Sequence, residues 1–261
     1  MKKLTLIVLT LGFFLVSCQQ KAQKTEASLE TEQKADYPKV LEFPSIDSLI
    51  ITAHLYQIDE TSPFILLCHQ ARFNKFEYAG IAERLNKMGF NCMAIDQRSG
   101  GPIGNTQNET YLRAVQANKG IDYVDAEVDI VAALDFINAN YSKKVILWGS
   151  SYSSTLALYL ATERDDIRAV ISFSPGNYLA DVKGSLIEKL EAFDKPMFLT
   201  SSKNEAKYVE ALLEKHKLKE KQIHFVPEGK GHHGSRNLWK NQQGGEEYWT
   251  AISSFLNSIK E

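Results

Sequence analysis

Short runs of apolar residues recur along the chain from about residue 40 onward. From 63–69 on, these runs are continuous and rich in Val, Ile, Leu and Phe, which is typical of strands covered on both faces of a parallel sheet. The 49–57 run alternates more between apolar and polar residues, which places it toward a sheet edge. The predicted strands cover 40–44, 49–57, 63–69, 90–96, 144–149, 168–173, 196–201 and 222–227.

Segments with apolar residues at helical spacing separate most of these runs. The predicted helices cover 76–88, 123–141, 156–162, 186–193, 205–214 and 247–259. Strands that alternate with helices through right-handed crossovers form a doubly wound sheet. The pattern therefore predicts an α/β fold, with a mostly parallel eight-stranded sheet and helices on both of its faces.

Two connections between the predicted elements differ from the others. The segment 97–120 is the longest without a clear pattern and holds several Gly and Asn residues, which favours a functional lid or binding loop. The segment 175–196 has room for one helix and no cap domain. We therefore expect an open site.

The first residues have the pattern of an export signal. Lys2 and Lys3 precede an apolar run, 4–16, that is too short to span a membrane comfortably. The junction Leu15-Val16-Ser17-Cys18 resembles a bacterial lipobox, in which the signal is cut before a cysteine that is then lipidated. The alternative is an ordinary signal peptide with a chance cysteine.

The N-terminal pattern also sets the predicted domain organisation. Residues 1–17 form a lipoprotein signal peptide, and 18–36 form a polar tether that cannot bury enough apolar surface to fold. The folded domain covers 37–261. A lipid at Cys18 would anchor this domain to a membrane of the bacterial cell envelope.

Charge and metal-binding residues exclude several classes of function. The formal net charge of −2 for 261 residues, without a basic block, gives no electrostatic reason to expect a nucleic-acid partner. No His-x-x-x-His or paired-cysteine pattern predicts a metal or another cofactor. Cys68 and Cys92 lie in predicted strands and are interpreted as buried and inert, with a disulfide between them as the alternative.

One strand-to-helix junction carries candidate chemistry. The strand 144–149 runs into Gly149-Ser150-Ser151-Tyr152-Ser153, close to the G-x-S-x-G nucleophile elbow. This turn displays a serine on a sharp bend and needs small neighbours, because strand and helix pass close together. Ser151 would be the nucleophile, and Ser153 stands where glycine is usual. The alternative is that these serines only cap the helix.

A serine needs a base, and in this topology an acid and then a histidine should follow later strands. The strand 196–201 leads to Asn204 and Glu205, and the strand 222–227 leads to a glycine-rich loop with His232 and His233. We choose Glu205 over Asn204, because only Glu205 carries a charge that would stabilise an imidazolium. Either histidine fits, and His-Gly-Ser favours His233.

An oxyanion needs donors, and the amide of Tyr152 is the first candidate. The loop after strand 63–69, His69-Gln70-Ala71, supplies the second, the amide of Ala71. Gln70 stands where such loops commonly carry glycine. His69 is interpreted as a structural residue bonded within the loop.

With these residues, the sequence resembles the α/β-hydrolase superfamily, in particular compact, lidless dienelactone-hydrolase-like serine esterases. The resemblance covers about residues 40–260. It is carried by the segments 69–71, 94–101, 148–153, 173–176 and 233–235. It implies hydrolysis of a small ester, thioester, lactone or amide through an acyl-enzyme, without a metal. Dienelactone hydrolases proper carry a cysteine where this chain has Ser151, so that named activity is not implied.

Substrate-binding residues are marked less clearly. Arg98 follows the strand 90–96 on the sheet edge of Ser151, where it would bind a substrate carboxylate or brace the loop. Tyr78 and Trp239 would lie at the mouth of the site or pack at its rim. The substrate is a small acyl compound. The competing functions are a surface lipoprotein that binds a ligand without turnover, and an acyltransferase that uses the same triad.

Overall fold

A computed structural model gives the structure of the protein and describes residues 37–260. Contacts divide the chain between Tyr37 and Pro38, and the folded unit begins at Pro38. The predicted signal peptide, the tether and Cys18 lie outside the described residues. Within the described part, none of the helices combines the length and the hydropathy needed to cross a membrane.

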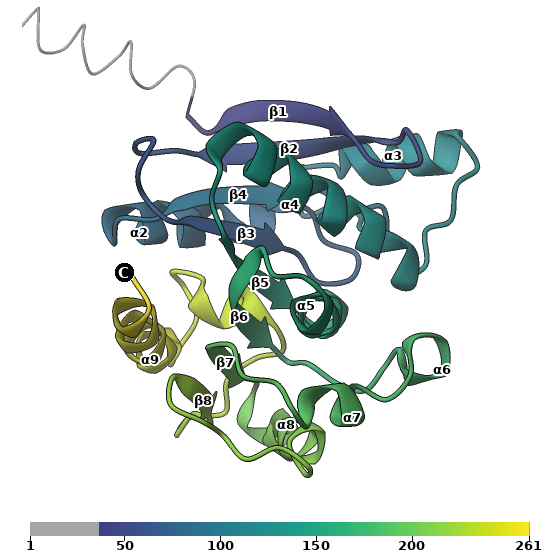
Figure 1. Cartoon of the computed structure of the whole chain (residues 1–261). Helices are drawn as coiled ribbons and strands as arrows, with labels where there is room; N and C mark the ends of the chain where they lie inside the picture. The colour runs from purple at the N-terminus through teal and green to yellow at the C-terminus, as the bar shows by residue number, and fades with distance from the viewer. Residues whose placement is uncertain (1–36, 261) are drawn as a thin grey trace, which may run out of the picture. The chain divides into compact units, whose positions relative to one another are not determined.

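The centre of the unit is an eight-stranded sheet in the order β1-β2-β4-β3-β5-β6-β7-β8 (Figure 1). Only the pairs β1–β2 and β2–β4 are antiparallel. The strands are β1 (Lys39–Pro44), β2 (Ile50–Tyr56), β3 (Phe64–Cys68), β4 (Asn91–Ile95), β5 (Val145–Ser150), β6 (Ile167–Phe173), β7 (Met197–Thr200) and β8 (Gln222–Phe225). The mostly parallel sheet predicted from the sequence is thereby confirmed.

Helices cover both faces of this sheet, as a doubly wound fold requires. The α-helices are α2 (Ala79–Lys87), α3 (Glu109–Gln116), α4 (Glu127–Tyr141), α5 (Tyr152–Glu163), α6 (Ala180–Lys183), α7 (Leu186–Leu190), α8 (Ala206–Leu212) and α9 (Gly245–Ser258). Short 3-10 turns are η1 (Lys75–Tyr78), η2 (Val124–Ala126), η3 (Lys203–Glu205) and η4 (Ser235–Leu238). Helices α2 and α9 pack on one face, and α4, α5, α7 and α8 pack on the other (Figure 1).

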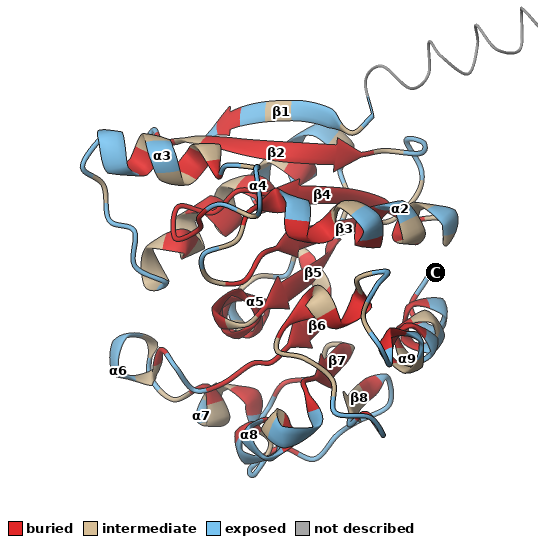
Figure 2. Cartoon of the chain, turned by 180° about the vertical axis from the view of Figure 1, so that it is seen from behind, coloured by how far each residue is buried: buried red, intermediate tan, exposed pale blue. Residues whose placement is uncertain are grey.

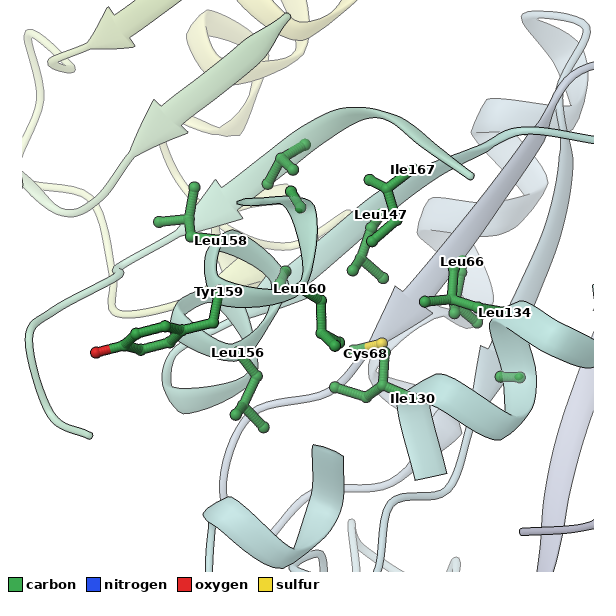
Figure 3. Packing of buried hydrophobic residues seen from close by; sticks show 14 of the residues in the cluster. Leu66, Cys68, Ile130, Leu134, Leu147, Leu156, Leu158, Tyr159, Leu160 and Ile167 are labelled. Atoms are coloured by element: carbon green, nitrogen blue, oxygen red, sulfur yellow. The ribbon is translucent and has the colours of Figure 1, made fainter. Parts of the chain in front are cut away.

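Successive side chains of the central strands enter two separate cores. Leu66 and Leu147 pack against α4 and α5, whereas Leu67 and Trp148 pack toward α2 and α9. Figure 3 shows the first of these cores, with Ile130 and Leu134 of α4 facing the sheet. The inner strands are buried on both faces and β1 is largely exposed (Figure 2). This two-sided burial explains why the apolar runs are continuous.

The two cysteines of the described chain lie on opposite faces of neighbouring strands. Cys68 ends β3 in the core beside α4 and α5, and Cys92 of β4 lies in the core beside α2 and α9. Both thiols are free and fully buried. Burial raises the pKa of each thiol, so both side chains behave as small apolar groups.

The connection 97–120 contains a helix that the sequence pattern did not predict. Its eight residues form α3, whose first turn is capped by the Asn108 side chain accepting from the Tyr111 amide at 2.7 Å. The large apolar residues Leu112 and Val115 are about half exposed, while the small Thr110 and Ala114 face the protein. In this helix the large apolar residues face solvent and the small residues face the core, the reverse of the usual helical pattern. The sequence pattern therefore predicts no helix here.

Two other segments differ from prediction. Helix α5 begins at Tyr152 rather than near 156, because the hydroxylated residues of its first turn are buried and bonded to neighbouring backbone. The connection 175–196 holds two short helices, α6 and α7, in place of one.

The junction of β5 and α5 makes a stability prediction. A Cβ on Gly149 would lie 2.4 Å from the Ser153 carbonyl oxygen, so Gly149→Ala must separate strand from helix. We expect a loss of about 2–4 kcal/mol in the free energy of unfolding, the range of overpacking and strain in a tight core. Urea denaturation followed by circular dichroism measures it.

Gly80→Ala is the matched control, because nothing lies within 4 Å of its added Cβ in helix α2. It should stabilise the protein by about 0.5–1 kcal/mol. A Gly149→Ala variant as stable as Gly80→Ala would contradict the close approach.

Candidate active site

Ser151 lies on a sharp turn between the last residue of β5 and the first residue of α5. Its backbone has φ 60° and ψ −125°, a strained conformation for a residue with a side chain. The Ser151 amide donates to the Phe173 carbonyl at 2.8 Å, and the Ser151 carbonyl accepts from the Ser154 amide at 2.9 Å. The turn is therefore held on both sides, from β6 and from α5.

The two small residues around Ser151, Gly149 and Ser153, are each required for a different structural reason. Gly149 is required because the backbone of α5 passes directly over it. The Ser153 hydroxyl lies 2.7 Å from the Cys68 carbonyl and 2.8 Å from the His69 carbonyl, and it accepts from the Ser150 amide at 3.1 Å. A hydroxymethyl group thus fits at the position where glycine is usual, and it ties the end of β3 to the turn.

The structure brings Ser151, His233 and Glu205 together from three loops at one sheet edge. His233 Nε2 lies 2.7 Å from Ser151 Oγ, and His233 Nδ1 lies 2.7 Å from Glu205 Oε1. The imidazole therefore links the hydroxyl to the carboxylate. All three residues are partly exposed, so the cluster is open to solvent.

Glu205 is held by further donors. Its Oε2 accepts from Ser174 Oγ at 2.8 Å and from the Ser202 amide at 3.4 Å. Burial alone would raise the pKa of Glu205, but the hydrogen bond and charge of His233 outweigh burial and lower this pKa to about 2. The Glu205 carboxylate is therefore ionised at neutral pH.

Ser174 is a residue of this site for which the sequence assigned no role. Its hydroxyl donates to Glu205 and accepts from the Gly234 amide at 3.0 Å, so it fixes the acid and the histidine loop together. Like Ser151, it has a positive φ, 55°. Its place directly after β6 was the available signal.

Asn204 and His232, the alternatives to Glu205 and His233, lie next to the three bonded residues but, within the described chain, make no hydrogen bond to Ser151 or to one another in their place. Asn204 is exposed and precedes Glu205 in η3. The His232 amide donates to Asn237 Oδ1 at 2.6 Å, which shapes the loop. The side chains of both residues line a polar hollow of about 260 Å³ next to His233, together with Ser202, Lys230, Gly231 and Arg236.

The candidate oxyanion amides belong to two segments that meet at the turn. Tyr152 is the first residue of α5, where amides have no partner within the helix. Ala71 follows Gln70, whose carbonyl lies 2.8 Å from His69 Nδ1. His69 Nε2 accepts from the Gln97 amide at 2.9 Å. Burial lowers the pKa of His69 to about 4, so this neutral ring braces the loop that carries Ala71.

No family model matches the sequence, and no curated protein is a detectable relative. The esterase Pf2001 of Pyrococcus furiosus is similar in structure, with a TM-score of 0.65, 19% identity and coverage of 84% of this chain and 91% of the esterase. A dienelactone hydrolase from Anabaena variabilis has a TM-score of 0.62 at 19% identity, covering 84% of this chain and 98% of that one.

A third solved structure, 2,6-dihydroxy-pseudo-oxynicotine hydrolase, has a TM-score of 0.64 at 15% identity and covers 95% of this chain and 77% of its own. The chain has the α/β-hydrolase fold. The turn at Ser151 lies at the junction of β5 and α5, where the sequence pattern predicts a nucleophile elbow.

Three residues expected at the mouth of the α/β-hydrolase site are bonded elsewhere. Arg98 is 3% exposed, and its guanidinium binds Asp129 at 2.7 Å and Asp47 at 2.8 Å. It therefore braces the loop after β4, which is the alternative to carboxylate binding. Tyr78 is fully buried and donates to the Cys68 carbonyl at 2.9 Å, so it cannot contact a substrate at the surface.

Trp239 is partly buried and lies on a different hollow of the hydrolase fold. Its Nε1 donates to the Glu77 carbonyl at 2.8 Å, and its ring stacks on Phe73. It lines a groove of about 900 Å³ between α2 and α9, whose lining includes neither Ser151 nor His233. Among residues 37–260, no group of three His, Cys, Asp or Glu side chains could hold a metal ion.

Glu77 is a second acid at this sheet edge, and no sequence pattern marked it. Its side chain is 1% exposed, and its oxygens accept from the Gln70 amide at 2.8 Å and from Ser150 Oγ at 2.9 Å. Burial raises the pKa of Glu77 to about 7, although both hydrogen bonds oppose this. The site thus holds one carboxyl with a lowered pKa and one with a raised pKa.

The buried pair of Arg98 and Asp129 predicts a large stability effect. Asp129→Ala leaves a buried guanidinium with half its partners, and we expect a loss of about 3–5 kcal/mol in unfolding free energy. Glu246→Ala, which breaks an exposed pair with Arg84, should cost less than about 1 kcal/mol. Urea titrations of the two variants measure both values, and similar losses would contradict the bracing role of Arg98.

Proposed function

We propose that the protein is a serine hydrolase that cleaves a small ester, lactone or thioester through an acyl-enzyme. The observation that carries this proposal is the single imidazole of His233 between the Ser151 hydroxyl and the Glu205 carboxylate, with both heavy-atom distances at 2.7 Å. The esterases and hydrolases among the solved structures of the same fold support a hydrolase function at a general level.

The mechanism follows from the hydrogen-bond directions. Because ionised Glu205 can only accept, His233 donates through Nδ1, and its Nε2 lone pair faces the serine. Nε2 takes the proton of Ser151 as Oγ attacks the carbonyl carbon. The amides of Tyr152 and Ala71 would donate to the oxyanion. The imidazolium then protonates the leaving group, and water repeats the sequence on the acyl-enzyme.

The surroundings of the triad favour a small, polar substrate. The hollow beside His233 is about 260 Å³ and is lined by His233 and polar neighbours, among them Lys230 and Arg236, while Ser151 lies outside its lining. Such a lining does not match a long acyl chain and would suit a short acyl or leaving group with polar or negatively charged atoms. A lipid at Cys18 would place this activity at the cell envelope, which is part of the proposal.

Two features of the sequence, Ser153 in place of glycine and the ambiguity between Asn204 and Glu205, would also suit a protein that binds a ligand without turnover. In the structure, each of them is compatible with catalysis. Ser153 has bonding partners for its hydroxyl, and Glu205 rather than Asn204 contacts the histidine. An acyltransferase would use the same triad with another acceptor than water, and product analysis separates that reaction from hydrolysis.

Ser151→Ala tests the nucleophile. It should lower kcat/KM for short-chain p-nitrophenyl esters by about 10,000-fold or more, because the members of a triad act as a unit. A fluorophosphonate probe should label the wild-type protein at Ser151 and leave the variant unlabelled. Equal hydrolysis by both proteins, or an unlabelled wild type, would remove the proposed function.

Neighbouring residues provide matched controls for the other two members of the triad. Glu205→Gln should lower kcat by about 1,000- to 10,000-fold, because a neutral amide neither fixes the donating tautomer nor stabilises the imidazolium. His233→Ala should cost at least as much. Asn204→Ala and His232→Ala should keep kcat within about tenfold of wild type. A reversal within either pair, measured by ester hydrolysis, would reassign the triad.

A further inference from the structure

A buried acid lies behind the triad and contacts none of its reacting atoms. Glu77 is in η1, and Glu205 already serves His233, so the proposed reaction does not use Glu77. A carboxylate that is removed from water without a paired cation is costly to keep. Because burial of the Glu77 carboxylate lowers the stability of the fold, the question is which function its hydrogen bonds serve.

The hydrogen bonds of Glu77 reach all three segments of the site. Its Oε2 accepts from the amide of Gln70, the residue before Ala71, and its Oε1 accepts from the hydroxyl of Ser150, the residue before Ser151. The Ser150 hydroxyl in turn accepts from the Ser235 amide at 2.8 Å. Ser235 lies two residues beyond His233 in the loop after β8.

We propose that Glu77 is a positioning residue, whose ionised carboxylate holds the oxyanion loop, the nucleophile turn and the histidine loop in their catalytic arrangement. This inference rests on the proposed function. Each side-chain hydrogen bond of Glu77 is to the neighbour of a candidate catalytic group, so its effect passes through backbone position. A misplacement of about 1 Å at a catalytic group can cost about 100-fold in rate.

The bonding pattern suits the ionised form of Glu77, which we propose is the active one. The Gln70 amide donates to Oε2, and the Ser150 hydroxyl, which already accepts from the Ser235 amide, has Oε1 as its own acceptor. A proton on Oε1 would have to be donated to Ser150 Oγ, which would then lose its acceptor. The groups that interact electrostatically with Glu77 are His233, Arg236, Tyr78 and Tyr152.

The raised pKa of Glu77 makes the stability of the protein depend on pH in a way that can be measured. The folded-state pKa of Glu77 is about 7, above the ordinary value of 4.5, so the proton on this group favours the folded state. That contribution is fully present below about pH 4.5 and is lost as the pH rises through about 7. The ionised carboxylate that the site needs therefore destabilises the fold at pH 8.

The test compares Glu77→Gln with Glu83→Gln, a substitution of an exposed glutamate on the adjoining helix α2. Glutamine keeps the shape, accepts from the Gln70 amide and donates to Ser150 Oγ. We expect Glu77→Gln to lower kcat for a short p-nitrophenyl ester by about 10- to 100-fold at pH 8 with little change in KM. Its urea midpoint at pH 8 should equal or exceed that of wild type.

The pH profile supplies the second readout. Below pH 7 the wild-type kcat should fall more steeply than that of Glu77→Gln, because the wild type also protonates Glu77 and the glutamine variant has no such proton to gain. Glu83→Gln should follow the wild type in kcat, pH profile and urea midpoint.

Three results would overturn the inference. One is a Glu77→Gln variant with the kcat and pH profile of Glu83→Gln. Another is a parallel loss of kcat and urea midpoint, which would make Glu77 a structural brace only. The last is a wild type without turnover and without fluorophosphonate labelling, which removes the proposed function and this inference with it. A wild type that labels while Glu77→Gln remains fully active removes the inference alone.

Discussion

The close passage of α5 over the end of β5 constrains the rest of this sheet edge. Gly149 has no room for a side chain, and Ser151 is forced to a positive φ between the two elements. This conformation is unfavourable by itself and persists only because the β6 carbonyl of Phe173 and the first turn of α5 hold it. The strain turns the hydroxyl out of the strand and toward the loops that follow β7 and β8.

Hydroxyl groups join the segments around this turn. Ser153 connects it to the end of β3, Ser150 connects it to Glu77 and the histidine loop, and Ser174 connects that loop to Glu205. A serine can accept and donate at once, so each one bridges two backbone segments within a small volume. The cluster of serines therefore has a structural cause that is separate from the proposed chemistry.

The two carboxyl groups of the site differ because their surroundings differ. Glu205 faces an imidazole and two further donors, so its pKa falls to about 2 despite partial burial. Glu77 has hydrogen bonds and no contacting cation, so burial dominates and its pKa rises to about 7. Arg98 lies apart from both, since Asp129 and Asp47 already bind its guanidinium.

The sequence alone determined the alternation of strands and helices, the parallel sheet and the order of the candidate residues Ser151, Glu205 and His233. These follow from local patterns, because two-sided burial makes strands continuous and the sheet edge gathers the residues that follow each strand. Only the tertiary structure decided which histidine reaches Ser151, where Arg98 binds, and that Glu77 and Ser174 belong to the site. Those outcomes depend on distances between segments far apart in the chain. Helix α3 was not predicted because its buried face is made of small residues, which give no apolar pattern in the sequence.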